Sequence, residues 1–432
     1  MTTVIGRLRG RVVGTRPGTN DSRAILVSSV ALIGGKVATM GFGFLAWIVA
    51  ARMYPTAEVG LASGAVAAVT LCAQVALIGV GSAVITLLPT FQARPGRLLD
   101  TAVSLLTVSG LLTALAFLLF AGTVLQELRV VAADPVYAVL FAVLAVAGTL
   151  GVLFDQASTA RRRGNQVLLR GVAAGVTTLL LVAIIAVAFG STSSQAIFVA
   201  WVVGGLVTWG LGLITLARSF PGYRYRPRLS RQISADLVRV GMPNYLLTLT
   251  ERAPGFVLPI VVTELLSPAD NAHWYIAWMM AWVVFVIPIQ VGMTSFAEIS
   301  REPARLRAIL EHGIRSSLVM GVAAAVGLAI VGGPALHLLG SGYAAAGLTP
   351  LWILLVGVVP MTFIQAYFSL SRARRELGPA IALGTVNSVA SIVVPGIAGV
   401  ASGLAGMAVA WLAVQCITAV AAVWRLRTLE SA

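Results

Sequence analysis

The chain has 432 residues, of which 58% are hydrophobic and 10% charged, and its mean hydropathy is +0.94. This composition excludes a soluble domain of useful size and indicates a membrane protein with many spans. The net charge of +15 would suggest nucleic-acid binding in a soluble protein, but in a membrane protein the basic residues must first be sorted by side of the membrane.

Apolar runs predict an all-α polytopic protein with about twelve transmembrane helices. Each run has about 20 residues, which is the length of a helix that crosses the hydrocarbon core of a bilayer. In chain order the runs cover residues 25–50, 61–88, 102–125, 135–154, 167–189, 196–217, 240–262, 272–297, 314–339, 348–370, 379–400 and 403–424. Residues 1–24 are rich in Arg, Gly and Thr and lack periodicity, which indicates a disordered cytoplasmic lead.

The distribution of basic residues predicts the orientation. With a cytoplasmic N-terminus, 26 of the 30 basic residues fall in the lead, the inner loops and the tail. Arg52 and Arg129 lie outside, and Lys36 and Arg252 lie within spans. The positive-inside rule therefore predicts cytoplasmic termini and an even number of helices, and no nucleic-acid partner is needed to explain the charge. The longest inner loop, 218–239, is basic and enforces this topology or holds anionic lipid headgroups.

Three pairs of segments predict an internal duplication. Pro55 pairs with Pro268, Gly81 with Gly292 and Gly164 with Gly378, at offsets of 211 to 214 residues. Each copy would hold six helices in the same orientation, which is a parallel repeat with substrate bound between the copies. We therefore expect an N-lobe over 25–217, the basic linker over 218–239 and a C-lobe over 240–432.

Two basic residues within spans form the predicted anion site. Lys36 lies about 16 Å into the first predicted helix at 1.5 Å per residue. Arg252 lies at a similar depth in the seventh helix, one helical turn from the position that the repeat pairs with Lys36. Two cations facing each other across a cleft suit an anionic guest such as a phosphate or pyrophosphate.

Other roles stay open for the same two helices. Glu251 would pair with Lys36 across the lobes in a closed state, or the lysine would only extend its charge toward the membrane surface. Gly34 and Gly35 interrupt the first helix and Pro254 the seventh, which suits a bending gate. Glycine in membrane helices also serves close packing.

Uncharged polar and aromatic residues within the spans are candidates for the cavity lining. The amides are Gln74, Asn244, Gln290, Gln365, Asn387 and Gln415, each of which alternatively forms a hydrogen bond between helices. Trp278 and Trp282 would offer faces for sugar stacking, or pack in the interior. The sequence shows no catalytic set, metal-ligand spacing or phosphate-binding loop, so it predicts neither an enzyme nor a cofactor.

One passage resembles the start of a known family of transporters. It reads Ala50-Ala51-Arg52-Met53-Tyr54-Pro55-Thr56-Ala57-Glu58-Val59-Gly60, and the following helix ends in Leu77-Ile78-Gly79-Val80-Gly81-Ser82-Ala83. This pattern is similar to Wzx-like polysaccharide flippases of the multidrug/oligosaccharidyl-lipid/polysaccharide exporter superfamily. The basic loop after the fourth predicted helix and the duplicated layout are similar too, so the resemblance spans most of the chain.

The resemblance implies a V-shaped transporter with two lobes in the bacterial plasma membrane. Such a protein moves an undecaprenyl-pyrophosphate-linked glycan to the outer leaflet by alternating access, beside membrane lipids, glycosyltransferases or a glycan polymerase. Cationic cavity residues are expected in such flippases, and Lys36 and Arg252 fit them. Two rivals remain: a cation-coupled multidrug exporter, which commonly has an acidic residue in its first helix, and a scaffold for glycan assembly that transports nothing.

Overall fold

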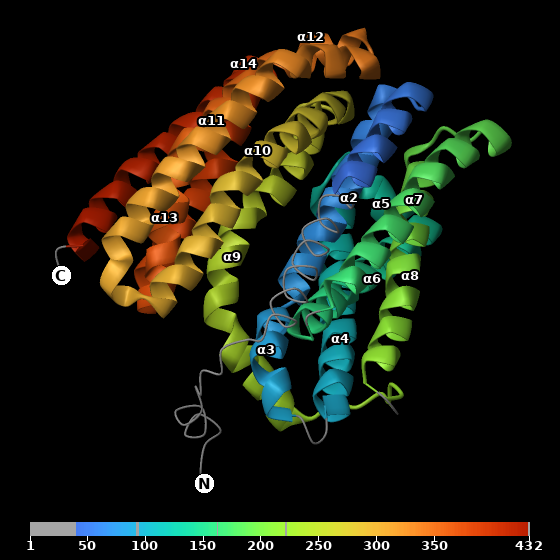
Figure 1. Ribbon diagram of the computed structural model, residues 1–432. Coiled ribbons are helices and arrows are strands. Elements are labelled where there is room, and N and C mark those ends of the chain that lie inside the picture. Colours follow the sequence, from blue (N-terminus) through green and yellow to red (C-terminus); the bar gives the residue numbers. More distant parts are fainter. Residues whose placement is uncertain (1–39, 92–94, 162, 221–222, 431–432) are drawn as a thin grey trace.

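The chain folds as a bundle of α-helices (Figure 1). The computed structural model describes residues 40–91, 95–161, 163–220 and 223–430, which contain no β-strand. A helix over Met40–Met53 comes first. It is followed by α2 (Thr56–Ala76), α3 (Val80–Leu87), η2 (Leu88–Phe91), α4 (Pro95–Val124), α5 (Arg129–Ala133), α6 (Pro135–Ala160), α7 (Gly164–Phe189), α8 (Ser194–Ser219), α9 (Arg231–Leu265), α10 (Pro268–Arg301), η3 (Pro303–Arg305), α11 (Leu306–Leu339), α12 (Ser341–Val356), α13 (Val358–Arg374) and α14 (Leu377–Glu430). The predicted lead over 1–24 and the first part of the first predicted span lie outside the described residues.

Most of these helices have the length and apolarity of membrane spans. Nine qualify within the described part of the chain, or ten if α12 and α13, which meet at a bend of 43°, form one span. Helix α14 contains two non-helical residues, Ser402 and Gly403, at the boundary predicted between the last two helices. Many large apolar side chains on α4, α7, α11 and α14 are exposed, as expected for helices that contact lipid. The chain is therefore an all-α polytopic membrane protein.

Helix α9 connects two groups of helices. Figure 1 shows α2 to α8, the N-terminal group, on one side and α11 to α14 on the other, with α9 and α10 between them. We count α10 to α14 as the C-terminal group. Leu237, near the start of α9, is buried among residues of α3, α4, α6 and α8. Leu247 is buried among residues of α10, α11, α13 and α14, and Pro243 lies between the two leucines. The first turns of α9 thus pack with one group and the following turns with the other.

Two glycines bring α9 against the N-terminal group at the end of the bundle that carries residues 223–230, here called the linker end. Gly79 lies between α2 and α3 with a φ of 80°, a conformation that favours glycine. A Cβ on Gly241 of α9 would lie 1.8 Å from the carbonyl oxygen of Gly79, so the two backbones are in direct contact. The expectation of one unbroken helix over 61–88 is wrong, because this left-handed residue ends α2 before α3 begins.

The two groups also meet at the opposite end of the bundle. A Cβ on Gly60 of α2 would lie 1.5 Å from the carbonyl oxygen of Pro268, at the start of α10. Asn271 of α10 donates from its amide to the Gly60 carbonyl at 2.9 Å and to Ser63 Oγ at 3.0 Å. The predicted repeat pairs the start of α2 with the start of α10, and these are the segments in contact.

A carboxylate on α9 adds a second contact at the opposite end. Glu264 accepts hydrogen bonds from three successive backbone amides of the turn between α4 and α5, Gln126, Glu127 and Leu128, at 2.6, 3.2 and 2.8 Å. Arg52 donates from its guanidinium to the carbonyl of Leu338 at the end of α11. Charge-assisted hydrogen bonds of this kind are stronger than neutral ones. They hold the two groups together at this end.

The contact at Gly60 yields a stability prediction. Gly60→Ala is expected to lower the melting temperature in detergent by several degrees, because overpacking a tight contact costs about 1 to 3 kcal/mol. Gly210→Ala on α8 is the matched control, since a Cβ there meets nothing within 4 Å. Equal melting temperatures for the two variants, measured by thermal unfolding of purified protein, would contradict the tight contact.

Candidate functional site

The predicted site residues lie in three places. Gly34, Gly35 and Lys36 lie outside the described residues. Seven others line a pocket formed by α9 and the C-terminal group: Glu251, Pro254, Trp278, Trp282, Gln365, Asn387 and Gln415. The remaining four, Gln74, Asn244, Arg252 and Gln290, lie on α2, α9 and α10 and do not line this pocket.

The pocket lies among α9, α10, α13 and α14. Its volume is about 30 Å³, which is room for one or two water molecules. The rest of its wall comes from Gly255, Phe285, Met361, Ile364, Phe368 and Trp411. All of these residues belong to α9 and the C-terminal group. The pocket is therefore inside one group of helices, whereas the sequence predicted a cavity between two.

A buried ion pair closes one side of the pocket. Arg372 of α13 donates from one guanidinium nitrogen to both carboxylate oxygens of Glu251 at 3.1 Å. The side chains of Arg372 and Glu251 are 5% and 11% exposed. The sequence offered Lys36 as the partner of Glu251, and the structure gives it Arg372. The two charges balance each other within the C-terminal side of the molecule.

Aromatic rings and amides form the other walls of the pocket. The ring of Trp278 meets that of Trp411 edge to face at 5.3 Å and lies 6.4 Å from that of Trp282. Asn387 Oδ1 accepts from Thr418 Oγ1 at 2.8 Å. Gln415 donates to Ser391 Oγ at 2.8 Å. With Trp278 buried between neighbouring rings and both amides engaged, these side chains pack the interior of the group in the arrangement described here.

Arg252 lies on a different face of α9 from Glu251. Neighbours on a helix point about 100° apart, while residues 11 apart lie within about 20° of each other. This spacing puts Arg252 on the same face as Gly241, which contacts Gly79 of the N-terminal group. Tyr245, two turns before Arg252, packs against the N-terminal cluster and lies within electrostatic range of the guanidinium. Arg252 therefore points toward the N-terminal group.

Arg252 is exposed, and no acidic side chain in the part of the chain that the structure describes forms an ion pair with it. No carboxylate of the described residues lies within 4.0 Å of its guanidinium. The buried hydroxyl of Tyr245 likewise has no hydrogen-bond partner there. Asn244 and Gln290 are exposed, and Gln74 is half-buried. The face of α9 that looks toward the N-terminal group thus presents an exposed cation that is available to an anionic ligand.

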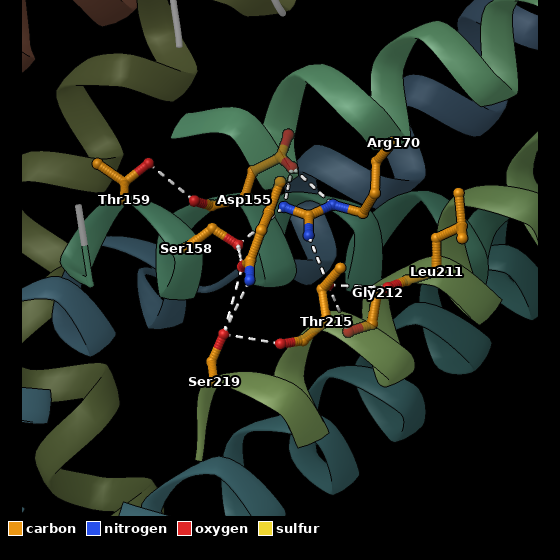
Figure 2. Close-up of polar contacts among 9 residues, drawn as sticks. Asp155, Ser158, Thr159, Arg170, Leu211, Gly212, Thr215 and Ser219 are labelled. Atoms are coloured by element: carbon orange, nitrogen blue, oxygen red, sulfur yellow. Dashed lines mark hydrogen bonds and ion pairs between the residues drawn. The ribbon is translucent and has the colours of Figure 1, made fainter. Parts of the chain in front are cut away.

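A second buried arginine organises the linker end of the N-terminal group (Figure 2). Arg170 of α7, 1% exposed, bonds Asp155 of α6 at 2.7 Å, Ser158 at 3.0 Å and Thr215 of α8 at 2.9 Å. Ser219 extends the cluster from the last turn of α8. Every hydrogen bond of this guanidinium serves to join α6, α7 and α8, so the cluster is structural.

Sequence reasoning missed the roles of Arg170 and Arg372. Both counted among the arginines of cytoplasmic segments, and the structure buries both. For Arg170 a signal was present, because it follows Val167, where the fifth predicted helix begins. For Arg372 no local signal exists, since Glu251 lies 121 residues earlier.

Comparisons with known proteins define the family. A family profile described as polysaccharide biosynthesis protein matches residues 49–348. The chain belongs to this family. No curated protein matches the sequence. Among solved structures, the fold is similar to the lipid II flippase MurJ in an inward closed conformation, with a TM-score of 0.71, 12% identity and coverage of 93% of this chain and 87% of that one.

The fold is also similar to multidrug transporters. An inward-facing MATE family transporter of the MOP superfamily gives a TM-score of 0.70 at 16% identity, with coverage of 91% of this chain and 96% of that one. An outward-facing MATE transporter gives a TM-score of 0.60 at 16% identity over 95% of this chain and 96% of that one. The chain is thus a multi-pass membrane protein of the polysaccharide biosynthesis family, and its fold is similar to that of transporters and flippases.

The ion pair in the pocket yields a coupling prediction. Arg372→Met is expected to destabilise the protein by about 3 to 5 kcal/mol, because it leaves the Glu251 carboxylate buried without its partner. Adding Glu251→Gln is expected to restore part of this loss. A double-mutant cycle from unfolding in detergent measures the coupling, and additive effects of the two substitutions would contradict the pairing.

The Arg170 cluster yields a second stability prediction. Arg170→Met is expected to cost about 2 kcal/mol, less than for a fully buried pair, because the side chain of Asp155 is 46% exposed. Arg239→Met, at an exposed position on α9, is the control and should leave the melting temperature unchanged. A melting temperature for Arg170→Met equal to that of this control would show that the cluster does not stabilise the bundle.

Proposed function

We propose that the protein moves a lipid-linked oligosaccharide, carried on undecaprenyl pyrophosphate, from the inner to the outer leaflet of the bacterial plasma membrane. The family match supports a role in polysaccharide biosynthesis. The observation that carries the substrate class is the position of Arg252, exposed on the face of α9 that looks toward the N-terminal group. A pyrophosphate satisfies this cation through charge-assisted hydrogen bonds.

Lys36 completes the proposed headgroup site. The predicted repeat pairs its helix with α9, so the lysine would approach the pyrophosphate from the first helix while Arg252 approaches from the seventh. Two cations match the charge and the multiple oxygens of a pyrophosphate better than those of a single phosphate ester.

Alternating access is the proposed mechanism, with the linker end facing the cytoplasm. In the arrangement described here, the Glu264 and Asn271 hydrogen bonds close the opposite end. Release of the glycan outward would require these contacts to break while the two groups rotate apart. The backbone contact between Gly79 and Gly241 lies at the linker end, where it would serve as a pivot.

The pocket of the C-terminal group favours the flippase over a cation-coupled multidrug exporter. Coupling to a cation requires a carboxylate that the cation is able to reach. Glu251 is the one carboxylate among the described residues that line this pocket, and Arg372 neutralises it. The likeness to MATE transporters concerns the fold and does not by itself supply a coupling site.

Substitution of the two cations tests the proposal. Arg252→Gln and Lys36→Gln are each expected to reduce flipping of a fluorescent undecaprenyl-pyrophosphate glycan in proteoliposomes at least about tenfold, since each charged hydrogen bond contributes about 1.5 to 3 kcal/mol. Arg252→Lys should restore part of the activity. Arg239→Gln removes an exposed charge from the same helix and should leave flipping unchanged.

The outcomes of this experiment separate the alternatives. Normal flipping by both glutamine variants would refute the anionic headgroup site. Absence of flipping by the wild-type protein, together with drug efflux from cells that express it, would support the exporter. Absence of both activities, with cell-surface glycan lost on deletion and restored by either glutamine variant, would support the scaffold.

A further inference from the structure

The basic linker between the two groups has a sequence in which tyrosine and arginine alternate, a pattern that suits an extended chain. Residues 223–230, which read Tyr-Arg-Tyr-Arg-Pro-Arg-Leu-Ser, have no helical or strand assignment and precede α9. In an extended chain, successive side chains point to opposite sides. This pattern puts Tyr223 and Tyr225 on one side and Arg224, Arg226 and Arg228 on the other.

A buried carboxylate of α4 holds the start of this segment. Asp100, 7% exposed, accepts a hydrogen bond from the hydroxyl of Tyr223 at 2.9 Å and another from the backbone N–H of Arg226 at 3.1 Å. Burial, followed by the hydrogen bond and charge of Asp100, raises the pKa of the Tyr223 phenol above its ordinary value. The phenol therefore stays a donor through the physiological pH range.

The same contact repeats one helical turn later. Ser104 Oγ lies 3.2 Å from the hydroxyl of Tyr225 and accepts from the backbone N–H of Arg228 at 3.2 Å. Two residues of extended chain advance about 6.7 Å, and four residues of helix advance about 6 Å, so the two repeats match. The segment is thus fixed in register along the first turns of α4.

Fixing the tyrosines leaves the arginines in a row. Arg224, Arg226 and Arg228 are all exposed, and no described carboxylate lies within 4.0 Å of their guanidinium groups. In an extended chain, the Cα atoms of residues two positions apart are about 7 Å apart, which is the spacing of successive arginines in this row. Three like charges at this spacing repel one another unless an anion lies between them, so the row favours a ligand with negatively charged oxygens.

An apolar surface begins directly beyond this arginine row on the same face of α4. Ser104, Val108, Leu111 and Leu115 follow one another at helical spacing, and the three apolar side chains are exposed. Leu111 and Leu115 also line a groove of about 520 Å³ with residues of α6 and α8, whose lining is almost entirely apolar. Leu111 lies about 10 Å along the helix from Ser104. One lipid could therefore place its headgroup at the arginine row and its acyl chain in the groove.

We propose that Arg224, Arg226 and Arg228, with the groove between α4, α6 and α8, form a binding site for an anionic phospholipid. The guanidinium groups take the phosphate, and an acyl chain passes Val108 into the groove. Exposed Leu229 and partly exposed Tyr225 lie beside the arginines, and such side chains are typical of the membrane interface. The site fixes the linker, and through it the start of α9, against the N-terminal group.

Native mass spectrometry with phosphatidylglycerol tests the site. The triple variant Arg224→Gln, Arg226→Gln, Arg228→Gln is expected to bind phosphatidylglycerol roughly 100-fold more weakly than the wild type, at about fivefold per arginine. Zwitterionic phosphatidylcholine should bind both proteins equally. The control variant Arg301→Gln, Arg375→Gln, Arg427→Gln removes the same charge from exposed positions elsewhere and should keep wild-type binding. An equal loss in this control would refute a local site.

A second variant tests whether lipid binding requires that the arginine row be held against α4. Ser104→Ala with Tyr225→Phe keeps every arginine and removes the second contact with α4, and it is expected to weaken phosphatidylglycerol binding about fivefold to tenfold. Unchanged binding would overturn the role of the register. Displacement of phosphatidylglycerol by an equimolar polyprenyl pyrophosphate would overturn the assignment to phospholipid and give the site to the transported lipid.

Discussion

Direct backbone contact at glycine is the constraint on which the arrangement of the two helix groups depends. Gly60 lies against Pro268 at one end of the bundle, and Gly79 lies against Gly241 at the other. Neither contact leaves room for a methyl group. Without them α2 would separate from α9 and α10 by the thickness of a side chain, and the hydrogen bonds of Glu264 would lose their geometry. Small residues are common at helix interfaces in membranes. Lipid is as apolar as the side chains, so close packing of the helices, rather than the hydrophobic effect, holds them together.

The arginines in the interior of each group form ion pairs, whereas Arg252 on the face of α9 forms none with the described residues. Arg170 and Arg372 are buried, and each has a carboxylate on a neighbouring helix. Such pairs add little net stability but fix which helices are neighbours, because breaking them is costly. Arg252 is one residue from a paired carboxylate and has no such partner among the described residues. The paired arginines on α7 and α13 thus join helices, whereas Arg252 on α9 stays available to a ligand.

Much of this arrangement follows from the sequence, and the limits have physical causes. Composition and apolar runs predict the fold class because a bilayer requires long apolar helices. Helical geometry predicts that Glu251 and Arg252 diverge, since neighbours point about 100° apart. The partner of Glu251 was not predictable, because Arg372 lies after an apolar run and is brought to it only by packing. The break in the helix at Gly79 and the hydrogen bonds that Asp100 accepts from Tyr223 and Arg226 also depend on contacts between segments far apart in the chain.

The crossing of α9 has a consequence for how the molecule is divided. The predicted C-lobe begins at residue 240, so residues 231–239 of α9 fall in the predicted linker. Packing joins Leu237, in this linker, to the N-terminal group and Leu247, in the predicted C-lobe, to the C-terminal group. The linker and the first helix of the second copy are therefore parts of one continuous helix. Any rotation of one group relative to the other has to be taken up within α9, where Pro243 lies between the two leucines.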